Sequence, residues 1–145
     1  MTTLADVVEL ARPESFLAVI STARADGTIQ SSIVNVGVLP HPITNRDVLA
    51  FVTYGPAKLR NLRERPQITA TIRSGWQWAA VEGQAELVGP EDPHDGIDAE
   101  GLRLLLRAIF RAAGGTHDDW DAFDKTMVDD GRGAVLIDPT RIYSN

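Results

Sequence analysis

Residues 54–66 of this 145-residue chain read YGPAKLRNLRERP and carry four basic side chains against one acid, Glu64. The preceding run 48–53 is apolar and the following run 67–73 alternates apolar and polar residues, so we expect a short helix between two strands. Basic residues near the start of a helix oppose the positive end of the helix dipole. A bound anion would relieve that conflict, because open helix N–H groups and a lysine together favour phosphate. The stretch therefore predicts a strand-helix-strand order and an anion site.

The composition predicts a single domain over residues 1–145. Hydrophobic residues make up 43% of the chain and charged residues 23%, which is typical of a globular protein. The net charge of -6 and the pI near 4.9 argue against nonspecific binding to nucleic acid or to anionic membranes. There is no cysteine, so disulfides, thiol catalysis and thiolate metal sites are excluded.

The first ten residues lack the basic start and long apolar run of a signal peptide, and they include Asp6 and Glu9. No apolar run approaches the 18 residues or so that a membrane span needs. We therefore expect a cytoplasmic protein that does not associate with a membrane.

Short β segments joined by tight turns predict an antiparallel barrel rather than alternating βαβ units. The expected strands are residues 16–22, 29–39, 48–53, 67–73, 76–88, 134–138 and a short run 141–143. The expected helices are residues 4–10, the short helix after the third strand, residues 102–113, and one that Thr116 caps. The fold class is mainly β, with six or seven strands and two helices before the last strand. Gly83 is expected to mark a bulge in its strand or a point of close backbone approach.

No catalytic side chain and no metal site is expected. The three histidines, His41, His94 and His117, are scattered over predicted loops without a metal-ligand spacing, and a surface or capping role is expected for them. The chain has no G-x-S-x-G elbow, no P-loop and no G-x-G-x-x-G sequence. Any reaction should therefore be carried by a bound cofactor, anionic and with a flat ring that lies against Trp76 or Trp78.

An ordered set of segments resembles a known family. The segments are Asp26-Gly27, residues 30–35 (QSSIVN), 51–53 (FVT), 57–62 (AKLRNL) and 78–83 (WAAVEG). Their order is similar to that in the split β-barrel proteins of the pyridoxamine 5'-phosphate oxidase-like superfamily. Within it, the chain most resembles the actinobacterial branch assigned to the deazaflavin coenzyme F420. The likeness covers residues 16–143 and is strongest over residues 48–87.

This resemblance implies a homodimer with two cofactor sites at the subunit interface. It implies that Lys58 holds the cofactor phosphate, with Pro56, Ala57 and Asn61 beside it. The remaining residues implied to contact the cofactor are Ser31, Ser32, Ile33, Val34 and Asn35 of the second strand, Val52 and Thr53 of the third, and Trp78 from the partner subunit. Trp76 is expected in the core or at the dimer interface.

The chain departs from the family pattern at two positions that bear on the cofactor. Many flavin-binding members carry arginines where this chain has Ser31 and Ala57, which favours F420 over FMN. The C-terminal Trp and Arg contacts of pyridoxamine phosphate oxidases are not recognisable after Tyr143, so that reaction is not assigned. Arg63 and Arg65 either reach a poly-glutamate tail of the coenzyme or pair with Glu64 at the surface.

Three functional hypotheses follow. The first is an F420-dependent oxidoreductase that transfers a hydride between the coenzyme and an electron-poor organic substrate. The second keeps the fold and uses FMN. The third is a carrier that binds F420 without turnover. The substrate itself cannot be read from the sequence.

Overall fold

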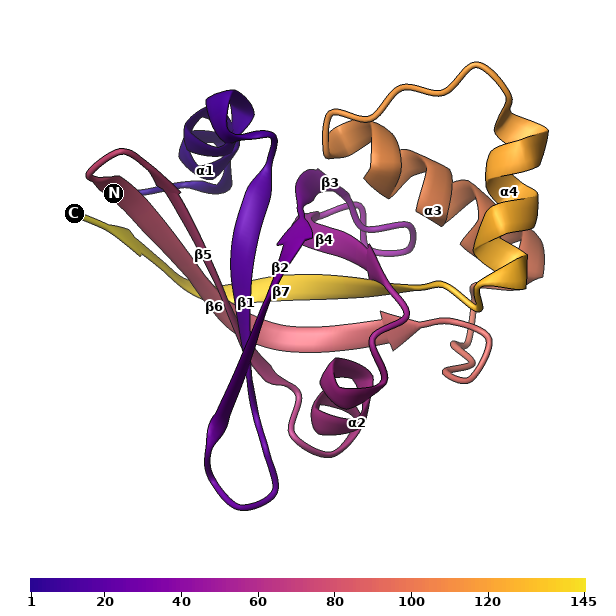
Figure 1. Ribbon diagram of the computed structural model, residues 1–145, viewed down its shortest axis with the longest axis horizontal. Coiled ribbons are helices and arrows are strands. Elements are labelled where there is room, and N and C mark those ends of the chain that lie inside the picture. The colour runs from indigo at the N-terminus through magenta and orange to yellow at the C-terminus, as the bar shows by residue number, and fades with distance from the viewer.

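The computed structural model describes residues 1–145 as a curled, seven-stranded antiparallel sheet surrounded by four α-helices (Figure 1). The strands are β1 Leu17–Ala23, β2 Ile29–Asn35, β3 Gly37–Pro40, β4 Asp47–Thr53, β5 Gln67–Ser74, β6 Gln77–Val88 and β7 Gly133–Ser144. The helices are α1 Leu4–Ala11, α2 Pro56–Glu64, α3 Ala99–Ala112 and α4 Trp120–Asp129, with a 3-10 turn at Arg12–Glu14. The expected mainly β architecture, with α2 between two strands and two helices before the last strand, is confirmed.

The sheet curls because its two edge strands are consecutive in the chain. The strand order is β2-β1-β5-β6-β7-β4-β3, yet only Val36 separates β2 from β3. Val36 is buried, and its N–H donates to the carbonyl of Phe16 at 2.8 Å. The single strand expected over residues 29–39 was wrong, because the chain passes at Val36 from one edge of the sheet to the other. No ladder joins β2 to β3 or β4, so the barrel stays split.

The long strands β6 and β7 pair over most of their length and carry the predicted bulge. Their register shifts between Glu82 and Gly83, and Gly83 lies opposite Pro139. Proline cannot donate to a ladder and is tolerated at such an irregularity. The chain therefore continues through Pro139 as one strand of 12 residues, whereas two separate runs were expected.

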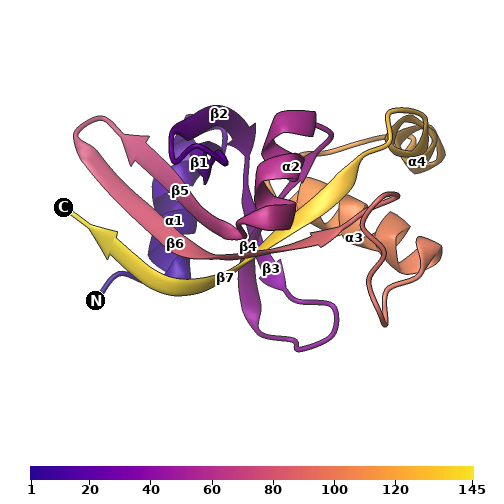
Figure 2. The ribbon, with the colours of Figure 1, turned by 90° about the horizontal axis from the view of Figure 1, so that it is seen from below.

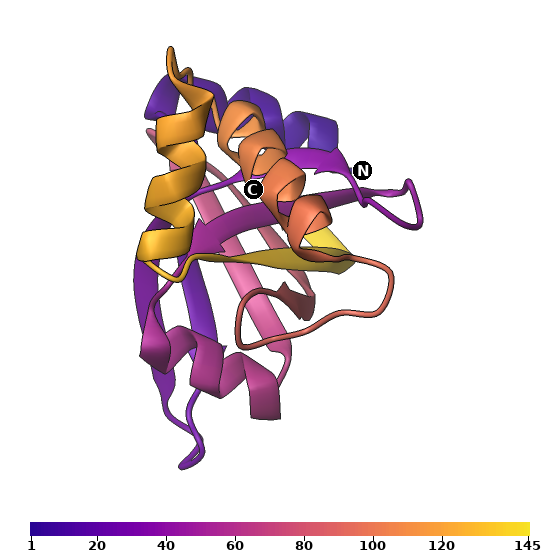
Figure 3. The same cartoon turned by 90° about the vertical axis from the view of Figure 1, so that its right-hand side faces the viewer.

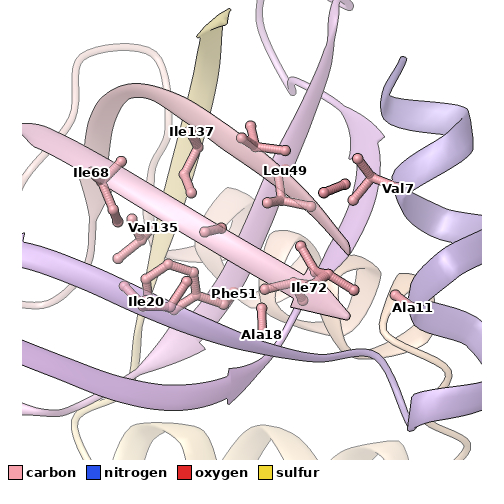
Figure 4. Packing of buried hydrophobic residues seen from close by; sticks show 14 of the residues in the cluster. Val7, Ala11, Ala18, Ile20, Leu49, Phe51, Ile68, Ile72, Val135 and Ile137 are labelled. Atoms are coloured by element: carbon pink, nitrogen blue, oxygen red, sulfur yellow. The ribbon is translucent and has the colours of Figure 1, made fainter. Parts of the chain in front are cut away.

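The inner face of the barrel forms the first hydrophobic core, which α1 covers at one end (Figures 2 and 4). Phe51, Leu49 and Ile137 are almost fully buried there. Because successive side chains alternate between faces, Val48 and Ala50 of the same strand point the other way, into a second core.

Helices α3 and α4 cover the outer side of β4 and β7 and enclose the second core (Figure 3). Leu105, Leu106 and Ile109 give α3 one buried apolar face at helical spacing. Helix α4 is capped by Asp119, whose carboxylate accepts the N–H of Ala122 at 3.1 Å, and not by Thr116 as expected. None of the helices has the length and apolar character needed to cross a lipid bilayer.

We expect Gly83→Val to destabilise the protein by about 1–3 kcal/mol, the usual cost of forcing atoms into a packed interior. A Cβ at this position would lie 2.2 Å from the carbonyl oxygen of Asp138. Urea unfolding measures the change. Gln84→Val, at the exposed next position, is the control and should change the free energy of unfolding by less than about 0.5 kcal/mol. Equal effects of the two changes would contradict the steric role of Gly83.

Candidate functional site

The site begins where β4 ends and α2 starts. Gly55 is the N-cap of α2 and Pro56 occupies its first turn, where a missing N–H costs nothing. No side chain caps the helix, and its first turn holds no acid. The Gly55 N–H instead donates to Thr53 Oγ1 at 3.1 Å, which shapes the turn. The first N–H groups of α2 are therefore left without a side-chain acceptor.

Lys58 stands in this first turn and points into the protein. Its residue is 7% exposed, and its Nζ donates to Ser32 Oγ at 2.8 Å. The ammonium lies 5.9 Å from the ring centroid of Phe51. Burial alone lowers the pKa of Lys58, since no carboxylate neighbours it to offset the loss of solvation. A bound anion would supply that missing counter-charge.

A buried hydrogen-bond chain fixes α2 against the strands below Lys58. Asn61 Nδ2 donates to Thr22 Oγ1 at 3.1 Å, and Thr22 Oγ1 donates to Gln30 Oε1 at 3.2 Å. Thr22 and Asn61 are 2% and 7% exposed. Buried polar groups satisfied in this way define one arrangement of the elements that carry them. These hydrogen bonds thus hold α2, and with it Lys58, in position between β2 and β4.

The second-strand residues implied to contact the cofactor fall on two faces. Ser32 and Val34 face the barrel interior, where Ser32 meets Lys58 and Val34 packs against the first core. Ser31, Ile33 and Asn35 lie on the opposite face, with Ile33 66% exposed. Ser31 Oγ lies 3.3 Å from Ser21 Oγ, and Asn35 Nδ2 donates to the carbonyl of Ser15 at 2.8 Å. This division follows from the alternation of side chains along a strand.

The structure brings four of the implied residues together: Ser32, Thr53, Lys58 and Asn61. Pro56 and Ala57 precede Lys58 in the first turn of α2. Val52 is half-buried and packs on the α3 side of β4.

Trp78 lies on the outer face of the sheet, opposite the face that carries Ser32. Its ring meets Tyr143 edge to face, with the centroids 6.0 Å apart, and it is 37% exposed. Trp76 is 94% exposed and so does not belong to the core. Contact of Trp78 with a cofactor from across a subunit interface stays a prediction.

Arg63 and Arg65 pair with carboxylates, whereas Lys58 does not. Arg63 Nε and Nη2 donate to the two carboxylate oxygens of Asp92 at 2.7 and 2.8 Å. Arg65 donates to Glu64 at 3.0 Å, which confirms the expected pairing, and to the carbonyl of Ala23 at 2.9 Å. Among the four basic residues of this stretch, Lys58 alone is buried, and no carboxylate pairs with its ammonium.

Two histidines that seemed scattered in the sequence converge on one carboxylate. His41 Nδ1 accepts two backbone N–H groups of its own turn, so Nε2 carries the proton and donates to Glu86 Oε1 at 2.5 Å. His94 Nδ1 donates to the carbonyl of Asp95 at 2.6 Å, and its Nε2 lies 3.0 Å from Glu86 Oε2. Of the surface or capping role expected for the histidines, His41 has the capping one: it is 8% exposed and its Nδ1 caps its own turn. This cluster fastens two long loops to β6.

Within this cluster the pKa values of His94 and Glu86 are shifted in opposite directions. The hydrogen bond to Glu86 raises the pKa of His94 above its ordinary value. Burial works to raise the pKa of Glu86, but hydrogen bonds from His94 and His41 outweigh it and hold that pKa below its ordinary value. Because the folded pKa of His94 is raised, its stabilising contribution is full below about pH 6.5 and is lost as the pH rises through the folded value.

We expect His94→Gln to lower the free energy of unfolding by about 1 kcal/mol at pH 5.5 and by much less at pH 8.5. Urea unfolding at the two pH values measures this difference. In a Glu86→Gln background the pH dependence of the effect should vanish, because the charged partner is gone. An effect of equal size at both pH values would show that His94 acts only by packing.

Comparisons with known proteins agree with this architecture. A sequence model of the family described as "Pyridoxamine 5'-phosphate oxidase" matches residues 4–144. Among solved structures, a conserved hypothetical protein from Mycobacterium tuberculosis superposes with a TM-score of 0.69 at 19% identity, covering 99% of this chain and 84% of that one. A protein described as an F420 reductase superposes with a TM-score of 0.59 at 18% identity, covering 89% and 90%.

A third solved structure is a pyridoxamine 5'-phosphate oxidase-related, FMN binding protein from Nostoc punctiforme. It superposes with a TM-score of 0.66 at 13% identity, covering 97% of this chain and 80% of that one. At these identities the structural likeness shows a common fold.

Proposed function

Because the chain belongs to the pyridoxamine 5'-phosphate oxidase family, we propose that it binds coenzyme F420 and acts as an oxidoreductase on an electron-poor organic substrate. The observation that carries this proposal is the buried, acid-free ammonium of Lys58 beside Ser32. The match to an F420 reductase by fold adds support.

The donors around Lys58 fit a phosphate. Two of the three ammonium hydrogens are not used by Ser32, and the first N–H groups of α2 have no side-chain cap. Pro56 and Ala57 place little bulk at the helix start. Lys58, Ser32 and the start of α2 would therefore hold the phosphate, with Asn61 and Thr53 keeping α2 and its turn in position.

Two positions favour the deazaflavin coenzyme over FMN. Ser31 and Ala57 stand where many flavin-binding relatives place arginines. Ser31 faces away from Lys58, and Ala57 beside it leaves one lysine to neutralise the phosphate. The FMN binding protein of the same fold keeps FMN as the second candidate. A carrier that holds F420 without turnover is the third, and it is distinguished by binding without oxidation of the reduced coenzyme in the presence of enones, quinones or tetrapyrroles.

Reduced F420, when bound, would supply the hydride for an electron-poor acceptor and would leave as the oxidised coenzyme. The chain itself needs to supply no acid, base or nucleophile for this step. Its contribution is to hold the coenzyme phosphate at Lys58 and to orient donor and acceptor, which is a large part of many rate enhancements.

We expect Lys58→Met to weaken F420 binding roughly tenfold to a hundredfold, since hydrogen bonds to charged groups contribute about 1.5–3 kcal/mol. The free energy of unfolding should not fall, because a buried ammonium without a counter-charge is removed. Fluorescence titration with F420, and absorbance titration with FMN, measure the affinities. Arg60→Met, a loss of the same charge at an exposed position of α2, is the control and should leave them within about threefold.

Unaltered affinity in Lys58→Met would show that the lysine is not the phosphate ligand. Failure of wild type to bind either coenzyme at micromolar concentration would overturn the proposed function. Tighter binding of FMN than of F420 would select the second candidate.

The outer sheet face supports a homodimer as the proposed state. Val19, Ile33, Trp76 and Trp78 are 40%, 66%, 94% and 37% exposed, and they lie on β1, on β2, and on β6 and the turn before it. Large apolar side chains gathered on one face commonly mark an interface. Such an interface would bring Trp78 to the partner, as the family resemblance implies.

We expect Val19→Lys to convert a dimer, of twice 15.8 kDa, into a monomer, because a charge would be buried at the centre of the interface. Sedimentation equilibrium measures the mass. Ile43→Lys, at a 52% exposed apolar residue in the loop between β3 and β4, should leave the dimer intact. A monomeric wild type would contradict the proposed assembly.

A further inference from the structure

A cavity of about 320 Å³ lies where the end of β4 meets α3 and α4. Six of its eight lining residues are apolar: Val52, Ile109, Phe110, Ala113, Phe123 and Met127. The other two are Asn35 and Arg132. Cavities of this size, mainly apolar with a few polar groups, are typical of small-molecule sites.

Arg132 brings a guanidinium to the wall of the cavity, and one of its donors is unsatisfied. Its Nε is buried without a hydrogen-bond partner, and it is the only side-chain nitrogen or oxygen of the protein in that condition. Asp130 forms an ion pair with Arg132, its carboxylate oxygen 3.6 Å from Nη2, but leaves Nε unpaired. A buried donor without an acceptor costs free energy, so its presence in a native site calls for a partner.

The position of Arg132 is fixed before any ligand arrives. The N–H of Arg132 donates to the carbonyl of Met127 and that of Gly131 to the carbonyl of Val128, which together close the end of α4. Gly131 has the positive φ of 65° that this helix ending requires. The guanidinium lies over the ring of Tyr54, 4.0 Å from its centroid. An arginine held from both sides loses little entropy on binding.

The cavity adjoins the residues assigned to the coenzyme. Its lining includes Val52 and Asn35, both of which the family resemblance implies as cofactor contacts. Tyr54, which stacks on Arg132, begins the turn that leads to Lys58. A molecule in the cavity would therefore lie on the α3 side of β4, next to two residues that the resemblance implies for the coenzyme.

We infer that this cavity receives the organic substrate, and that Arg132 selects flat apolar molecules that carry one carboxylate. No Asp or Glu lines the cavity, so the guanidinium is its only charged group and favours an anionic ligand. Guanidinium and carboxylate form the stronger, charge-assisted hydrogen bonds. The aromatic rings of Phe110 and Phe123, with centroids 5.0 Å apart, offer a wall for a flat ring. The inference rests on the proposed function for the identity of the neighbouring coenzyme.

The test uses 2-naphthoate and the uncharged 2-naphthylmethanol as probes, titrated by calorimetry into the full-length protein without coenzyme. Wild type should bind the carboxylate at least tenfold more tightly than the alcohol. Arg132→Met should weaken naphthoate binding at least tenfold and leave the alcohol within threefold. Arg46→Met, which removes an arginine 69% exposed at the opposite end of β4, should change neither affinity.

A second variant tests the cavity without altering charge. Met127→Trp should fill the space and weaken both probes at least tenfold, with circular dichroism confirming that each variant is folded. If the affinity for 2-naphthoate is unchanged in both Arg132→Met and Met127→Trp, the inference is overturned.

Titration of naphthoate into protein saturated with F420 separates this inference from the proposed function. Both molecules should bind together, whereas displacement of F420 would show that the cavity belongs to the coenzyme and would overturn the inference. If F420 binds through Lys58 but naphthoate is insensitive to Arg132, the inference alone fails. If F420 does not bind while naphthoate follows Arg132, the proposed function fails and the carboxylate site stands.

Discussion

The fold depends on a constraint at Val36, where one residue joins two strands that lie at opposite edges of the sheet. A flat seven-stranded sheet would hold its edges far apart, since neighbouring strands are spaced by about 4.8 Å. The sheet must therefore curl until β2 comes close to β4. That curl brings Ser32 of β2 to Lys58, which follows β4. The candidate phosphate site is thus a consequence of how the barrel nearly closes.

The same closure explains why the split of the barrel is stable without a ladder between its edges. Helix α2, which follows β4, is tied to β1 by Asn61 and Thr22 and to β2 by Lys58 and Ser32. These side-chain hydrogen bonds link the end of β4 to the other edge of the sheet, and they leave Lys58 buried with no acid. A protein selected for stability alone would not keep an ammonium there, so its retention is consistent with a requirement for function.

Much of this architecture could be predicted from the sequence because local signals agree with the final structure. The apolar run 48–53 and the alternation of residues 67–73 predict β4 and β5 within one residue, and the stretch between them predicts the short helix α2. The break at Val36 could not be predicted, because the residues on both sides favour a strand and only the sheet order requires a crossing. The cluster of His41, Glu86 and His94 was missed for a similar reason, since 45 and 8 residues separate the histidines from their carboxylate.

Charge distribution links the two sites more closely than the sequence suggests. Most arginines are neutralised at the surface, such as Arg63 by Asp92 and Arg107 by Asp124, in keeping with the net charge of -6. Lys58 and Arg132 differ, because each keeps a buried donor that no carboxylate accepts. Tyr54 is stacked on Arg132 and stands two residues before Pro56, the first residue of the helix that carries Lys58. In an acidic protein, two such cations would attract two anionic groups, one on the proposed coenzyme and one on the proposed substrate, and so help to fix their relative orientation.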